Sequence, residues 1–299
     1  MLNLPAYTAH EALVAPARPK SQLWRLFMGL VLVAGVFLFA NQVMHQTLRT
    51  LLGPTAYGAL VGSDSASSQI SVIFLLSSFG LLIVGIVVAL RVVHARWITD
   101  VIGDRAVFAK QFAAVLTLLL VMNFAIAILP PWDFGAPLEP NVPFRAWLLV
   151  LPFALCAVLI QVSAEEILFR GYLQQQLAAR FSSPAVWILV PALLFGWGHY
   201  MPQAAGANAN LIVIWACIFG VLMADLTARA GTLGPAIAVH FMNNVVAILV
   251  ISAQESLSGL SLYLSPFTLS DTEQVRAWLP VDFAMMIVSW LAARLAIRR

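Results

Sequence analysis

The stretch VSAEEILFRGYL, residues 162–173, places two adjacent carboxylates and an arginine at the end of an apolar run. A charged side chain near the middle of a bilayer costs roughly 2.5 to 3.5 kcal/mol, so such groups persist where they are paired or take part in chemistry. Glu166 and Arg170 are four residues apart and share a helical face, which predicts an ion pair. Glu165 is turned away by about 100°. We therefore expect Glu165 to point into the protein without Arg170 as a partner.

Two more polar pairs lie in apolar runs. Phe195 and His199 in FGWGHY, and His240 and Asn244 in HFMNN, are each four residues apart and share a face of a helix. On a purely structural interpretation, the glutamates and His199 are ordinary helix-end groups. An acid, two imidazoles and an amide on three apolar segments, in a chain with five histidines, instead favour one convergent interior site.

The elements that must position these groups are membrane helices. The 299 residues are 62% apolar and 10% charged, with a mean hydropathy of +0.92, whereas soluble domains are roughly 45 to 50% apolar. Unbroken apolarity without period-two alternation excludes a β-barrel. We therefore predict an all-α polytopic membrane helix bundle with about eight transmembrane helices: 24–43, 70–93, 112–129, 146–168, 185–200, 210–228, 233–252 and 281–297.

Charge and composition give the topology and the domains. With the N-terminus inside, 13 of the 16 lysines and arginines fall in cytoplasmic segments, so we expect both termini to be cytoplasmic. Residues 1–22 predict a flexible cytoplasmic tail, and residues 23–299 a single transmembrane domain. The net charge of +3 without a basic aromatic cluster argues against nucleic acid as a partner. Asp225 and Arg229, four apart, are expected to pair.

Taken in order, the motifs resemble those of a known family. The patterns Glu165-Glu166-x-x-x-Arg170, Phe195-x-x-x-His199 and His240-x-x-x-Asn244 are similar to those of the CAAX prenyl protease and bacteriocin-processing family of intramembrane endopeptidases, which includes the type II CAAX prenyl endopeptidases. The resemblance covers about residues 145–252, which are the expected catalytic core. It implies hydrolysis of a peptide bond inside the membrane.

The resemblance also implies roles for single residues. Glu165 would activate water alongside His199, and His240 and Asn244 would stabilise the oxyanion. Glu166 and Arg170, with Phe195, would support the site. The implied partners are membrane lipid and a peptide or protein substrate, which could be membrane-anchored or lipidated, in a bacterial inner (plasma) membrane.

A metal is left open at this stage. Glu165, His199 and His240 could form the three-ligand zinc site of many hydrolases, yet the His-Glu-x-x-His helix of the common zinc proteases is absent. Glutamate-activated water without a metal is the other mechanism that the family resemblance allows.

Two functions of other classes remain as alternatives. A proton- or cation-coupled transporter could use Glu165, His199 and His240 as a relay. A non-catalytic immunity or interaction protein would not depend on Glu165 or His240. The sequence does not select a substrate.

Overall fold

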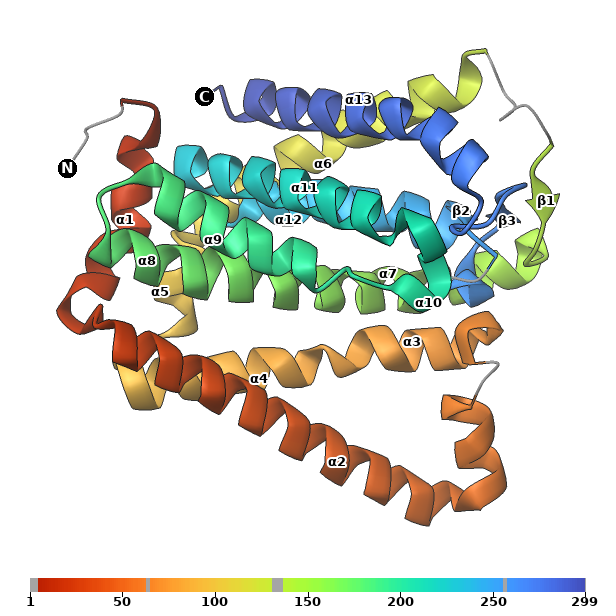
Figure 1. Cartoon of the computed structure of the whole chain (residues 1–299), viewed down its shortest axis with the longest axis horizontal. Coiled ribbons are helices and arrows are strands. Elements are labelled where there is room, and N and C mark those ends of the chain that lie inside the picture. Colours follow the sequence, from red (N-terminus) through yellow and green to blue (C-terminus); the bar gives the residue numbers. More distant parts are fainter. Residues whose placement is uncertain (1–4, 63–64, 131–136, 255–256, 299) are drawn as a thin grey trace.

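The computed structural model describes residues 5–62, 65–130, 137–254 and 257–298. It is a bundle of apolar helices whose first described helix, η1 (Pro5–His10), and the end of its last helix lie at the same end of the bundle (Figure 1). We call this end the terminal end. The predicted all-α helical bundle is confirmed.

Six helical stretches of the described chain are long and apolar enough to cross a membrane. They are α2 (Leu23–Val61); α3 (Gln69–Ser78), α4 (Gly80–Ala89) and η4 (Leu90–His94); α6 (Arg105–Ile128); α7 (Phe144–Glu166), η5 (Ile167–Leu173) and α8 (Gln174–Arg180); α10 (Pro202–Ala205), η6 (Gly206–Asn208) and α11 (Ala209–Ala230); and α13 (Thr272–Ile297). Two shorter apolar stretches are α9 (Pro184–Trp197) and α12 (Gly234–Asn244) with η7 (Val245–Val250). Six long stretches and two short ones correspond to the approximate count of eight.

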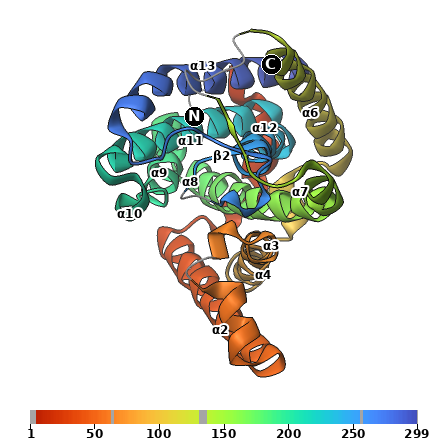
Figure 2. The ribbon, with the colours of Figure 1, turned by 90° about the vertical axis from the view of Figure 1, so that its right-hand side faces the viewer.

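The helices fall into two groups. Helix α2 packs on α4 and diverges from the remaining bundle, in which α9 packs on α11, and α6 on α12 and α13 (Figures 1 and 2). Helix α5 (Ile98–Ile102) connects the groups at the terminal end. All three helices with polar motifs, α7, α9 and α12, belong to the larger group.

A small sheet joins the chain segments at the opposite end. Strands β1 (Glu139–Pro140), β2 (Ile251–Ser252) and β3 (Tyr263–Leu264) have the order β1-β3-β2, with β3 antiparallel to β1 and parallel to β2. Because β1 precedes α7 and β2 follows η7, the sheet holds together the ends of two helices that carry site residues.

The N-terminal segment differs from the predicted tail. Its described part folds into η1, α1 (Glu11–Val14) and η2 (Ala15–Lys20), and Leu13 and Ala17 are fully buried. Prolines divide the segment into very short helices. No helical period therefore develops over which the buried residues could be recognised in the sequence.

Several boundaries also differ from the prediction. The fourth predicted span does not end at residue 168, because the helix continues to Arg180, with Arg170 and the three glutamines at 174–176 buried against protein. The helix of the first predicted span, 24–43, continues to Val61 across a kink at Gly53, where φ is 77°. The helix of the last predicted span, 281–297, already begins at Thr272. Residues 131–136, in the middle of a turn-rich stretch, lie outside the described residues.

Candidate active site

The centre of the site is a buried ion pair at the junction of α7 and η5. Arg170 Nη1 donates to Glu166 Oε1 at 2.9 Å, and the two side chains are 1% and 0% exposed. Arg170 Nη2 also donates to the Gly220 carbonyl at 3.4 Å, and the guanidinium lies 4.6 Å from the centre of the Phe195 ring. The predicted Glu166–Arg170 pair is present in the structure. Each charge offsets the desolvation of the other.

Helix α12 brings His240 to both glutamates. Its Nδ1 lies 2.8 Å from Glu166 Oε1, so the N–H at that nitrogen donates to a carboxylate that Arg170 already holds in place. Its Nε2 then faces Glu165 Oε2 across 3.6 Å. The second nitrogen of His240 and the carboxylate of Glu165 are thus presented to each other from two different helices.

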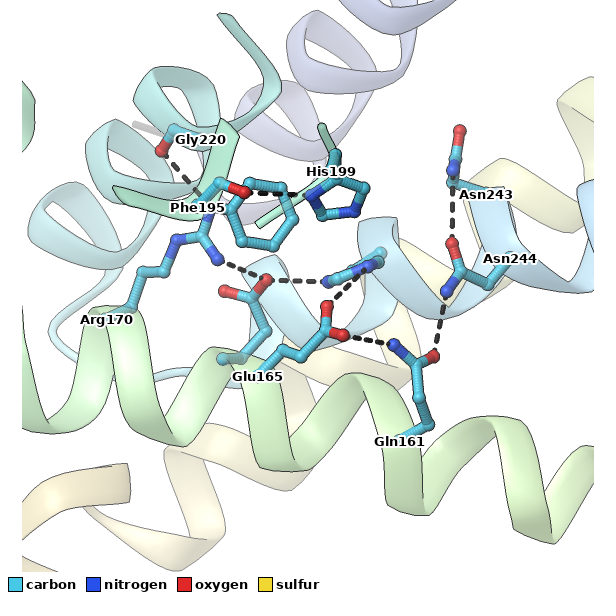
Figure 3. Close-up of polar contacts among 10 residues, drawn as sticks. Gln161, Glu165, Arg170, Phe195, His199, Gly220, Asn243 and Asn244 are labelled. Atoms are coloured by element: carbon cyan, nitrogen blue, oxygen red, sulfur yellow. Dashed lines mark hydrogen bonds and ion pairs between the residues drawn. The ribbon is translucent and has the colours of Figure 1, made fainter. Parts of the chain in front are cut away.

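Gln161 is a member of the site that the sequence did not single out. It lies one turn before Glu165 on α7, and its Nε2 donates to Glu165 Oε1 at 2.6 Å. Its Oε1 accepts from Asn244 Nδ2 at 2.9 Å, and Asn243 Nδ2 donates to Asn244 Oδ1 at 3.2 Å (Figure 3). In the sequence, Gln161 could have been recognised as an amide four residues before a glutamate in an otherwise apolar run. Gln161 therefore connects Glu165 to Asn244, another predicted site residue.

His199 lies beside the Phe195 ring, just beyond the end of α9. Its Nδ1 is 2.8 Å from the Phe195 carbonyl, so this nitrogen carries the donated proton. The Phe195 ring is 4.6 Å from the His199 ring and 5.9 Å from the His240 ring. Within the described part of the chain, no hydrogen bond or ion pair joins His199 to Glu165, whose imidazole neighbour is His240.

Aromatic side chains shield the polar groups. Phe195 and Phe219 are each 2% exposed, and the Phe219 ring lies 5.0 Å from the His240 ring. Electrostatic interactions in such an apolar enclosure are stronger than in water. Inside it, Glu165 Oε2 and Glu166 Oε2 are buried and accept no hydrogen bond within the described structure. Unpaired buried polar atoms are rare and commonly mark functional sites.

The donor groups near Glu165 are arranged in hydrogen bonds and close contacts between side chains. Across the residues that the structure describes, no three His, Cys, Asp or Glu side chains form a group that could hold a metal ion. The three-ligand zinc site of Glu165, His199 and His240 stays a prediction from the sequence, and no chemical step below passes through a metal.

Comparisons with known proteins agree with the site geometry. Residues 146–246 match the family described as type II CAAX prenyl endopeptidase Rce1-like. We refer to this matched stretch, about a third of the chain, as the Rce1-like domain. This domain runs from the start of α7 into η7 and includes all three polar motifs. It supports a membrane protease function of the CAAX type in general.

One relative spans most of the molecule. The chain is 24% identical over 260 residues to the uncharacterized protein YyaK of Bacillus subtilis (strain 168), covering 83% of this chain and 85% of that protein. No solved structure matches. Together with the six apolar helices, the Rce1-like domain identifies a multi-pass integral membrane protein.

Proposed function

We propose that this protein is an intramembrane endopeptidase in which Glu165 is the general base. The observation that carries the proposal is the approach of Glu165 Oε2 to His240 Nε2, 3.6 Å apart across α7 and α12. This separation exceeds a hydrogen bond. Because Glu165 Oε2 accepts no hydrogen bond from the described residues, it is available to accept a proton from a substrate water.

The reaction follows from this placement. The oxygen of water attacks the carbonyl carbon of the scissile peptide bond while Glu165 Oε2 takes one of its protons. The tetrahedral intermediate then collapses: the C–N bond breaks, and the proton held by Glu165 passes to the leaving nitrogen. The products are a carboxyl and an amine terminus. Gln161, through its hydrogen bond to Oε1, keeps the carboxylate turned toward the reacting water.

Two other side chains suit the charge that develops on the carbonyl oxygen, and a third can hold the substrate or its water. His240, when protonated, donates from Nε2 while Glu166 holds its Nδ1. Asn244 Nδ2 gives one hydrogen to Gln161 and has a second one for the oxyanion. His199 is anchored through Nδ1, so its Nε2 remains to orient the substrate or its water. Loss of one oxyanion donor typically costs about 2.7 to 4 kcal/mol of transition-state stabilisation.

The proposed substrate is a peptide or protein held at the membrane, including lipid-modified ones, that reaches the site between the helices. Both termini would face the cytoplasm of a bacterial cell, because 13 of the 16 basic residues then lie on that side.

The test compares membrane peptidomes of cells that express the intact protein or the Glu165→Gln variant at equal abundance. We expect a set of cleavage products that appears with the intact protein and disappears with Glu165→Gln. Glu273→Gln, which removes an exposed carboxylate in the first turn of α13, is the matched control and should keep every product. Identical peptide sets from all three would contradict proteolysis and favour the alternative of a proton- or cation-coupled transporter.

A further inference from the structure

Asp282, in the middle of α13, is an unusual carboxylate. It shares a helical face with Met286 and Ala293, four and eleven residues further on, which are 6% and 0% exposed. The opposite face, with Val288 and Leu291, is the outward, apolar one, at 45% and 49% exposed. Asp282 thus belongs to the inward face, yet it is itself exposed. The inward face of α13 is therefore accessible at this residue.

The carboxylate of Asp282 has no partner in the described chain. Its side chain makes no hydrogen bond or ion pair with a described residue. A carboxylate at this depth in a membrane helix is costly unless it faces water or a binding partner. The two other carboxylates that lie this deep in the larger helix group, Glu165 and Glu166, both have partners.

Asp282 lies at a depth in the bundle similar to that of the candidate active site. The next residue, Phe283, packs into the same apolar cluster as Phe195 and Phe219, whose rings touch His199 and His240. The depths of Asp282 and Phe219 along their helices can be compared, because Trp290 Nε1 donates to Asp225 at 3.0 Å and so aligns α13 with α11. From that contact, Asp282 is about 12 Å and Phe219 about 9 Å further from the terminal end.

We propose that Asp282 binds a cationic side chain, Lys or Arg, of the peptide substrate, and so determines which sequences are cleaved. This inference rests on the proposed endopeptidase function. The carboxylate of Asp282 is on the inward face, is exposed and has no partner within the described chain. It also lies at the depth of the catalytic groups. Such a carboxylate is complementary to a single positive charge. A substrate ammonium or guanidinium would supply the partner that the described residues do not provide.

The first experiment extends the peptidome comparison to Asp282→Asn and Asp282→Glu. We expect Asp282→Asn to lower products with Lys or Arg near the cleavage point by about tenfold, with other products unchanged, because one charge–charge contact is lost. Asp282→Glu should retain them, as should the control Glu273→Gln. If Asp282→Asn yields the same products as the intact protein while Glu165→Gln yields none, the Asp282 proposal fails and the endopeptidase stands. If Glu165→Gln changes nothing, both fail.

The second experiment tests the accessibility of position 282 without relying on cleavage. In a Cys156→Ala/Cys217→Ala background, which removes both native thiols, Asp282→Cys and Leu291→Cys are treated with a charged thiol reagent in open membrane fragments. The Asp282→Cys variant should react, and the Leu291→Cys variant, altered on the outward apolar face, should not. Equally low labelling of the two variants would overturn the proposal, because a cationic side chain could not reach position 282 either.

Discussion

His240 Nδ1 and Arg170 Nη1 both donate to a single oxygen, Oε1 of Glu166, at 2.8 and 2.9 Å. This shared acceptor connects the α7 ion pair to the imidazole on α12 and fixes which nitrogen of His240 faces Glu165. The two adjacent glutamates consequently differ in their surroundings. Glu166 is fully buried and its Oε1 accepts from both Arg170 and His240, whereas Glu165 is 15% exposed and, within the described chain, accepts a hydrogen bond only from the amide of Gln161.

Replacement of each glutamate should therefore have a different effect. Glu166→Ala leaves Arg170 buried without its counter-charge, and the free energy of unfolding should fall by about 3 to 5 kcal/mol. Glu165→Gln keeps the hydrogen-bonding shape and should change it by less than about 1 kcal/mol while abolishing cleavage. Thermal unfolding in detergent, with activity measured alongside, distinguishes the two. Equal destabilisation by both variants would contradict the division of roles.

Gln161→Leu tests the amide that the structure adds to the site. The change removes the donor to Glu165 Oε1 and the acceptor for Asn244, so both groups lose their alignment. We expect kcat to fall by about 10- to 100-fold with little change in KM, because the lost contacts orient catalytic groups and do not bind substrate. Gln111→Leu, an amide on α6 that bonds Thr232 and the Ala230 carbonyl, is the control and should leave kcat unchanged. Equal kcat for Gln161→Leu and the intact protein would exclude this role.

Local pairs were the part of the site that the sequence could predict. Glu166 with Arg170, and Asp225 with Arg229, are four residues apart, and both ion pairs are present in the structure, at 2.9 and 2.8 Å. Residues at that spacing are neighbours on any helix, whatever its packing. The sequence therefore sufficed for them.

Contacts between helices were not predictable in the same way. The bonds from His240 to Glu166, and from Asn244 to Gln161, depend on the rotation and depth of α12 against α7. Neither is encoded in the spacing of residues along one helix. The approach of His240 to Glu165 shows the same difficulty, because the family motifs give the set of residues but not which of them meet.

The N-terminal segment offers a pH-dependent test. His10 is 4% exposed against the Trp187 ring, and burial lowers the pKa of His10 to about 4. The unfolded segment binds the proton more readily, so docking is fully stable above the ordinary histidine pKa of 6.5 and weakens as pH falls from there toward 4. Hydrogen exchange of residues 5–20 should accelerate across this range. His10→Phe keeps the ring packing and should remove the acceleration. If hydrogen exchange still accelerates at low pH in this variant, another titrating group is responsible.

Asp225 joins three elements, and this predicts non-additive mutations. Its carboxylate accepts from Arg229 Nε at 2.8 Å, from Tyr7 Oη in η1 at 2.8 Å and from Trp290 Nε1 in α13 at 3.0 Å. Asp225→Asn should destabilise both the N-terminal segment and α13. In a double-mutant cycle with Tyr7→Phe, we expect a coupling of about 0.5 to 3 kcal/mol in the unfolding free energy. Simple addition of the two effects would mean that the Tyr7 contact contributes nothing.

A close approach of α9 to α11 sets the position of His199, and a methyl group can test it. At Gly196 a Cβ would lie 2.2 Å from Cys217 Sγ and 2.9 Å from the Val213 carbonyl oxygen, so Gly196→Ala must push the two helices apart. Small residues at helix interfaces in membranes permit such contact. Because His199 follows Gly196 by three residues, we expect activity to fall at least about tenfold and stability by about 1 to 3 kcal/mol.

Gly198→Ala is the matched control for this change. It adds the same methyl group two residues along the chain, where the nearest atoms are carbonyl oxygens of its own helix at 3.3 and 3.7 Å, so it should leave α9 in place. Cys217→Ala in the Gly196→Ala background should restore little, because the backbone oxygen of Val213 still obstructs the methyl group. Full activity in Gly196→Ala would show that α9 can move away from α11 without displacing His199, and that this imidazole does not need its observed position.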